Sequence, residues 1–216
     1  MLMCVFGYCN LIEIYLPLDK VTMRSLQHAI KAHGIPDSEL GPDAITNIMS
    51  SYDNLTVFPD AAELLEGLGE GSLSSANTPG GVLEHVIFSN GTPTMIEAAI
   101  SSSPLLQARF GPESTSSSLL GQGNPKYISI YDLNVYKPSP KAYNYVLKKL
   151  EREGLEKSVY LVSGNPFDIV GAKVAGLGTI WVNRTGTMWA DCLLGEEERP
   201  QFEVKGLGEV MELPLN

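Results

Sequence analysis

The sequence predicts an α/β protein with a parallel sheet, and three observations lead to this prediction. Short β-branched and aromatic runs alternate with helical patterns beyond residue 83. Strands that alternate with helices imply parallel pairing through right-handed crossovers. The 216 residues are 44% hydrophobic and 19% charged, which is typical of one globular domain, with or without a small inserted cap.

The first third of the chain is predicted to be helical. Apolar residues recur at helical spacing from about residue 20 until Gly34-Ile-Pro36, where the first helix should end. Further helices are expected at 42–52 and at 61–68, the latter opened by Pro59 or Asp60. The apolar stretch 1–6 is open to three interpretations: a first strand, a disordered start, or, least favoured because it lacks a basic flank, a signal peptide.

The remaining elements alternate in type. The predicted helix 139–152 should have a core-facing side formed by Tyr143, Val146, Leu147 and Leu150. Residues 69–82 and 111–125 are rich in Gly, Ser and Pro and are predicted to be loops. The expected order is strand 82–88, helix 93–101, strand 127–131, helix 139–152, strand 158–162, helix 167–175, strand 179–182 and a strand-helix piece near 202–211.

Composition disfavours several classes of partner. With 15 basic and 25 acidic side chains, the formal charge is -10, and an acidic surface repels nucleic-acid phosphates. No apolar run reaches the roughly 18 residues of a membrane-spanning helix. Three cysteines without framework spacing indicate a reducing, cytoplasmic compartment. The sequence does not decide the oligomeric state, so a monomer and a homodimer are both compatible with it.

Polar side chains follow three predicted strands. Ser89 and Asn90 come after the first, Lys137 after the second, and the run 163–168 (Ser-Gly-Asn-Pro-Phe-Asp) after the third. Ligands bind at the carboxyl edge of open parallel sheets, so these groups should meet at one site. Ordinary turn chemistry explains each group alone, but explains three together less well.

Lys137 and Asp168 are the most informative of these residues. A lysine between a strand end and Pro138 should point into the pocket and pair with carboxylates; the alternative is a solvated loop lysine. Asp168 lies at the start of a predicted helix, where the positive end of the helix dipole stabilises a carboxylate. The alternative is a plain first-turn aspartate. His85 has no second histidine at ligand spacing.

Several blocks, in order, resemble type II (S)-2-haloacid dehalogenases of the haloacid dehalogenase superfamily. The resemblance spans roughly residues 15–212 and implies a Rossmann-like parallel sheet with helices on both faces plus a partial helical cap. It divides the chain into an uncertain N-terminal segment (1–14), a cap remnant (15–58) and an α/β core (59–216). The blocks that carry it are 52–60, 86–91, 136–138, 161–168 with Gly171 and Ala172, and 181–186.

The resemblance also implies roles for individual residues. Family enzymes displace halide from C2 of a short 2-haloacid with an aspartate, and water then hydrolyses the ester. Ser89 would bind the substrate carboxylate, Asn90 the departing halide, and Phe167 would wall the halogen pocket. Lys137 would fix the nucleophile and Asp168, which helps to activate water. The implied catalytic set is Lys137, Ser163, Asn165 and Asp168, without metal or cofactor.

The family's nucleophile block, a strand followed by Asp-x-Tyr-Gly-Thr, has no counterpart in this sequence. Gly7 stands where the aspartate would be, and the first aspartate, Asp19, lies in the cap helix. The resemblance therefore implies a truncated, inactive form in which two strands lack ladder partners, unless residues 1–6 substitute. A small-anion binding module and a phosphatase relative stay open. The latter is disfavoured because Ser163 replaces an acid that would help to hold Mg²⁺.

Overall fold

The computed structural model describes residues 14–36, 39–67, 85–112, 126–191, 195 and 199–215. The predicted alternatives for residues 1–6 and the loop 69–82 lie outside these ranges, as does most of the loop 111–125. Helix α2 (Leu18–Ala32) buries Val21 and Ile30 and ends before Gly34, whose φ of +67° suits glycine. The first predicted helix is therefore confirmed.

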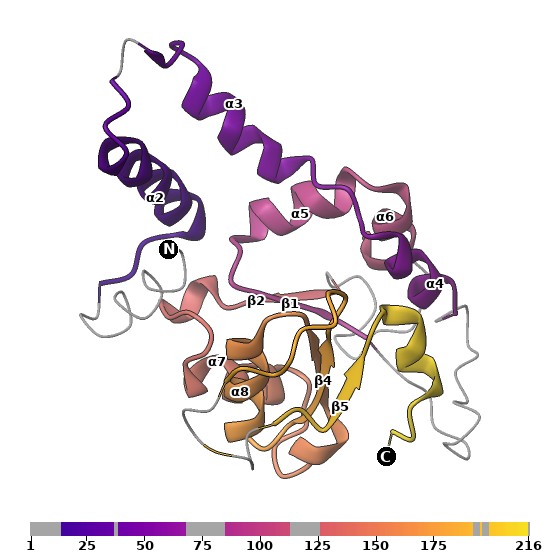
Figure 1. Cartoon of the computed structure of the whole chain (residues 1–216). Helices are drawn as coiled ribbons and strands as arrows, with labels where there is room; N and C mark the ends of the chain where they lie inside the picture. Colours follow the sequence, from indigo (N-terminus) through magenta and orange to yellow (C-terminus); the bar gives the residue numbers. More distant parts are fainter. Residues whose placement is uncertain are drawn as a thin grey trace.

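Three further elements complete the N-terminal part of the chain. They are α3 (Ala44–Ser50), the 3₁₀ turn η2 (Ser51–Asp53) and α4 (Pro59–Gly67). Helix α3 buries none of its residues, whereas α4 buries Leu65. Figure 1 shows α2 and α3 standing away from the strands, with α4 placed against the rest of the molecule.

All the strands pair in parallel, as the sequence predicted. Strand β1 (Ile87–Ser89) pairs with β2 (Tyr127–Ser129), and β4 (Gly178–Val182) lies between β3 (Tyr160–Ser163) and β5 (Phe202–Val204). Within the described residues these strands form two separate sheets, because no ladder joins β1 to β3. Among the described residues β4 pairs on both sides, whereas β1, β2, β3 and β5 each pair on one side only.

Helices cover both faces of the strands, which confirms the predicted architecture. On one face α5 (Pro93–Ser101) and α6 (Pro104–Phe110) pack with α4 against Ile87 of β1. On the other face α7 (Pro140–Lys149) and α8 (Pro166–Val174) enclose Phe88, the next residue of β1. Short 3₁₀ turns complete the chain: η3 (Tyr131–Leu133), η4 (Glu156–Ser158) and η6 (Leu207–Glu212).

Gly171 allows α8 to lie against α7. A Cβ at this position would lie 2.5 Å from the Tyr143 hydroxyl oxygen and 2.8 Å from Cβ of Pro138. Tyr143 has no free space to move into, since it is fully buried. The absent side chain is therefore a packing requirement.

Replacing Gly171 by alanine should destabilise the protein by about 1–3 kcal/mol, the usual cost of overpacking a core. Urea unfolding measures this loss. Gly41→Ala is the matched control, because a Cβ there meets no atom within 4 Å. Equal stability of the two variants would contradict this account of the α7–α8 contact.

His85, just before β1, is a half-buried base whose two ring nitrogens are shielded from solvent. Neither ring nitrogen has a partner among the described residues, and the ring packs edge-on against Phe110 at 5.4 Å. Burial, together with the positive charges of Arg109 and Lys126, lowers its pKa from 6.5 to about 4. The folded protein therefore holds His85 neutral.

Because the pKa of His85 is lower in the folded state, the unfolded chain takes up the proton first. The stabilisation is present above pH 6.5 and should be lost as the pH falls from 6.5 towards 4. His85→Phe should reduce the drop in urea midpoint between pH 7.5 and 5. His28→Gln, at an exposed site, should leave that drop unchanged. An undiminished drop in His85→Phe would refute this assignment.

Candidate functional site

Lys137 connects the end of β1 with the start of α8. Its backbone N–H donates to Asn90 Oδ1 at 2.9 Å, and its Nζ donates to the carbonyl oxygen of Phe88 at 3.2 Å. The same Nζ donates to Asp168 Oδ2 at 2.8 Å and lies 4.4 Å from the centre of the Phe88 ring. Only 7% of Lys137 is exposed, so the predicted inward direction is confirmed and the solvated alternative is wrong.

Asp168 is held from two sides. It lies in the first turn of α8 and is 4% exposed. Its Oδ2 accepts from Lys137, and its Oδ1 accepts from the Tyr143 hydroxyl at 2.7 Å. Burial, reinforced by the negative charge of Asp168 and the hydrogen bond to it, raises the pKa of Tyr143 far above its ordinary range. Tyr143 thus stays protonated and serves as a donor.

The turns after β1 and β2 are joined by hydroxyl groups. Ser89 Oγ accepts from the backbone N–H of Gly91 at 2.9 Å, and Ser129 Oγ donates to the Gly91 carbonyl at 2.6 Å. The Ser129 hydroxyl also accepts from Tyr131 N–H at 3.1 Å. These bonds fix the turn on which Asn90 sits beside Lys137.

The third strand end forms a turn of its own. Ser163 Oγ accepts from the backbone N–H of Asn165 at 3.1 Å, and the Asn165 carbonyl accepts from Asp168 N–H at 3.0 Å. Asn165 is exposed, and Phe167 is half-buried. Among the described residues, no hydrogen bond links Ser163 or the Asn165 side chain to Lys137.

The structure therefore brings part of the predicted set together. Lys137 is hydrogen-bonded directly to Asn90 and to Asp168, and Ser89 adjoins Asn90 through its turn. Ser163 and Asn165 lie next to Asp168 along the chain, and the roles of all these residues stay predictions. Tyr143 was predicted only as a core residue, although a buried tyrosine hydroxyl normally requires a partner.

The arrangement is suited to binding a small anion. An ammonium has three N–H groups, and Lys137 uses two of them on described residues, so one is left for a ligand. Mg²⁺ would need several oxygen ligands, but the described residues contain no group of three His, Cys, Asp or Glu side chains able to hold a metal. The charged side chains described at this site are those of Lys137 and Asp168.

Lys137→Met should destabilise the fold by about 3–5 kcal/mol, because it leaves the Asp168 carboxylate buried beside an apolar group. Tyr143→Phe should cost less, about 1–3 kcal/mol, since it removes one neutral donor. Urea unfolding measures both losses. Lys141→Met, at an exposed position of α7, is the control and should change stability by less than about 0.5 kcal/mol. A neutral Lys137→Met would show that the pair is not structurally required.

Comparison with known proteins extends this description. No family model matches the chain. The (S)-2-haloacid dehalogenase 4A of Burkholderia cepacia is 30% identical over 177 residues, which are 82% of this chain and 64% of that protein. The (S)-2-haloacid dehalogenase of Pseudomonas sp. (strain YL) is 27% identical over 205 residues, covering 94% of this chain and 73% of the relative. The chain thus spans about two thirds of the length of these relatives.

Solved structures agree with the sequence matches. A crystal structure of a dehalogenase with an intermediate complex covers 100% of this chain at 26% identity, with a TM-score of 0.72. An L-2-haloacid dehalogenase at 24% identity covers 98% of the chain with a TM-score of 0.73, which supports the fold. The chain is therefore related, in sequence along most of its length and in fold, to the (S)-2-haloacid dehalogenases of the haloacid dehalogenase superfamily.

Proposed function

We propose that this chain is a hydrolase-family protein that holds the carboxylate of a small 2-haloacid at the edge formed by Ser89, Asn90 and Lys137. The observation that carries the proposal is the buried Lys137 ammonium, which has an N–H left over at the end of β1. Because Asp168 is paired with this ammonium, the remaining N–H acts as a hydrogen-bond donor that water screens little, and not as an unpaired charge. The names of the sequence relatives supply the substrate class.

Asp168 is poorly placed to act as a nucleophile. Its two oxygens already accept hydrogen bonds from Lys137 and Tyr143, and these bonds lower the energy of the carboxylate. It suits the task of orienting or activating water next to the bound acid. In this proposal Ser163 and Asn165 position that water, and Phe167 lines the halogen side.

Turnover by the family reaction needs a second carboxylate that attacks C2 of the substrate. Among the described residues, Asp168 is the only carboxylate bonded to Lys137. We therefore propose that the 216-residue chain binds small carboxylates without releasing halide. In this form it is a small-anion binding module, and the described residues around Ser163 offer no metal site that would favour a phosphatase.

The proposal further assigns residues 15–58 to a cap remnant and 59–216 to the core. The boundary falls where α4 begins at Pro59. Asp60, one residue after this boundary, forms an ion pair with Arg184, with 2.8 Å between Asp60 Oδ2 and Arg184 Nε. This ion pair ties the start of α4 to the loop after β4. Among the described residues, no helix combines the length and apolar character needed to cross a membrane.

Calorimetry with (S)-2-chloropropionate and with propionate should show saturable binding of both acids. Ser89→Ala and Lys137→Met, each checked for native circular dichroism, should weaken binding about 10-fold or more, since each removes a donor to the ligand carboxylate. Lys141→Met and Ser102→Ala are exposed controls and should bind normally. Equal binding by all four variants would contradict the site.

Chloride release from (S)-2-chloropropionate should not exceed that of the Lys137→Met variant. The physical reason is the lack of an attacking carboxylate at Lys137 among the described residues. An ion-selective electrode follows the reaction. Steady chloride release above that of the variant would show that an attacking group is present in this chain.

A further inference from the structure

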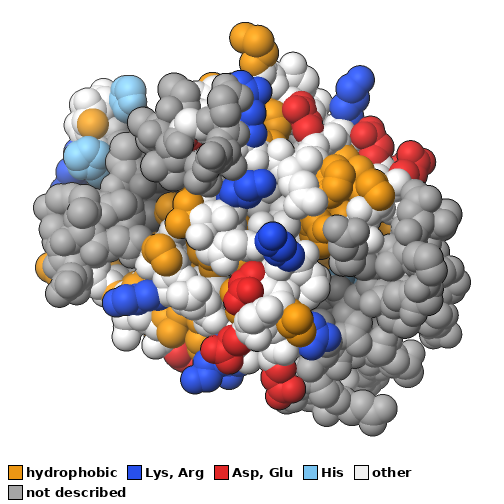
Figure 2. Space-filling view, turned by 90° about the horizontal axis from the view of Figure 1, so that it is seen from below, with side chains coloured by type: hydrophobic (Ala, Val, Ile, Leu, Met, Phe, Trp, Pro, Cys, Tyr) orange, Lys and Arg blue, Asp and Glu red, His pale blue; other side chains and the backbone are white. Residues whose placement is uncertain are grey.

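A second pocket lies at the opposite end of strands β3 and β4 from Lys137 and Asp168. Its volume is about 370 Å³, which is within the range of small-molecule sites. It is lined where β3 starts, at Tyr160, and where β4 starts, at Gly178, whereas the residues of the candidate site follow the ends of these strands. Figure 2 views the molecule from below and shows both Lys or Arg and Asp or Glu side chains near the middle of this face.

The floor and one wall of this pocket are rigid. Leu177 and Gly178 are buried, and Gly178 N–H donates to the carbonyl of Val159 at 2.9 Å. The Tyr160 ring lies so close to Gly178 that a Cβ there would come within 2.5 Å of it. The Phe202 ring packs against the Tyr160 ring, with 6.4 Å between the two ring centroids. The Tyr160 ring therefore packs directly on the backbone of residue 178, and a side chain there would displace this wall.

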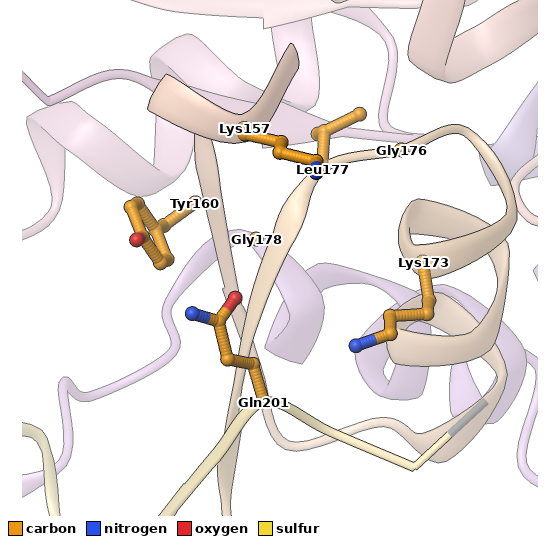
Figure 3. A pocket seen from close by; sticks show the side chains of 7 residues that line it. All are labelled: Lys157, Tyr160, Lys173, Gly176, Leu177, Gly178 and Gln201. Carbon is orange, nitrogen blue, oxygen red and sulfur yellow. The ribbon is translucent and has the colours of Figure 1, made fainter. Parts of the chain in front are cut away.

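Two lysines supply the charge of this pocket. Lys157 belongs to η4 and Lys173 to the last turn of α8, and neither forms an ion pair with a described residue. Figure 3 shows Lys173 extending from α8 towards β4, with the Gln201 amide between it and Tyr160. The chain has a formal charge of -10, so two ammonium groups at one hollow, without carboxylate partners in the described part of the chain, are a local exception.

One carboxylate beside this pocket, that of Glu156, already accepts a hydrogen bond. Glu156 packs beside Gly176, but its Oε1 accepts from the backbone N–H of Gly154 at 2.8 Å. The backbone N–H groups of Glu156 and Gly154 lower the pKa of this carboxyl, so it stays ionised where it is. Among the described residues, Lys157 and Lys173 thus have no carboxylate partner.

We propose that this pocket binds a small organic dianion, with Lys157 and Lys173 contacting its charged groups. Lysine is a compact point charge suited to phosphate and carboxylate groups. The Gln201 amide can donate to a further oxygen, and the Tyr160 ring offers an apolar wall for the carbon skeleton. The ligand is a phosphomonoester or a dicarboxylate. The pocket is independent of the haloacid site and needs no turnover there.

Titration of ¹⁵N-labelled protein with inorganic phosphate, glycerol phosphate and succinate, at constant ionic strength, tests the proposal. Saturable shifts should centre on the amides of Gly176 and Gly178. Stronger binding of glycerol phosphate than of succinate identifies the phosphomonoester, and the reverse identifies the dicarboxylate. Shifts centred on Asn90 and Gly164 would place the anion at the haloacid site and overturn the proposal.

Variants distinguish a built site from general charge attraction. Lys157→Ala/Lys173→Ala should weaken binding at least 10-fold, and Lys173→Arg, which keeps the charge, should stay within about 3-fold of the parent. Lys141→Ala/Lys148→Ala removes the same charge at exposed positions of α7 and should change binding less than 2-fold. Equal losses in the two double variants, or no saturable binding by the parent chain, would refute the pocket. Loss of 2-chloropropionate binding alone would not affect it.

Discussion

The buried pair of Lys137 and Asp168 is the interaction on which the arrangement of strand ends depends. Its ammonium and carboxylate are both almost fully removed from water, which is costly unless each charge is matched by the other and by further hydrogen bonds. Here the Phe88 carbonyl and the Tyr143 hydroxyl complete that matching. Through these contacts one lysine links the end of β1 to α8, which packs on β3 and β4, and, by way of Asp168, to Tyr143 of α7.

The sequence was sufficient to predict most elements and the inward direction of Lys137, because apolar periodicity and strand-end position are local signals. It was not sufficient for the partner of Asp168, since Tyr143 serves both as a core residue and as a donor. Helix α6 was missed, although Ser103 caps it and Pro104 opens it, as Thr92 and Pro93 do for α5. Its shortness, seven residues inside a Ser- and Pro-containing stretch, obscured that signal.

The split into two sheets depends on long-range pairing that periodicity does not describe. Strand β4 is buried at every residue, as expected for a parallel strand covered on both faces, whereas β1 is only half-buried throughout. Ser163 and Asn165 were predicted from their strand-end position, which places them in the correct turn but cannot specify their bonding. Relatives named as dehalogenases supply the chemistry, and geometry decides which side chains can contribute to it.

The division of the strands into two sheets also affects the order in which parts of the protein unfold. Hydrogen-bonded ladders make each sheet cooperative internally, while side-chain contacts alone join the two among the described residues. A pair of three-residue strands is marginal by itself. Partial opening should therefore begin at β1 and β2 and hydrate the buried charges, while the backbone amides of β4 keep their protection against exchange with solvent.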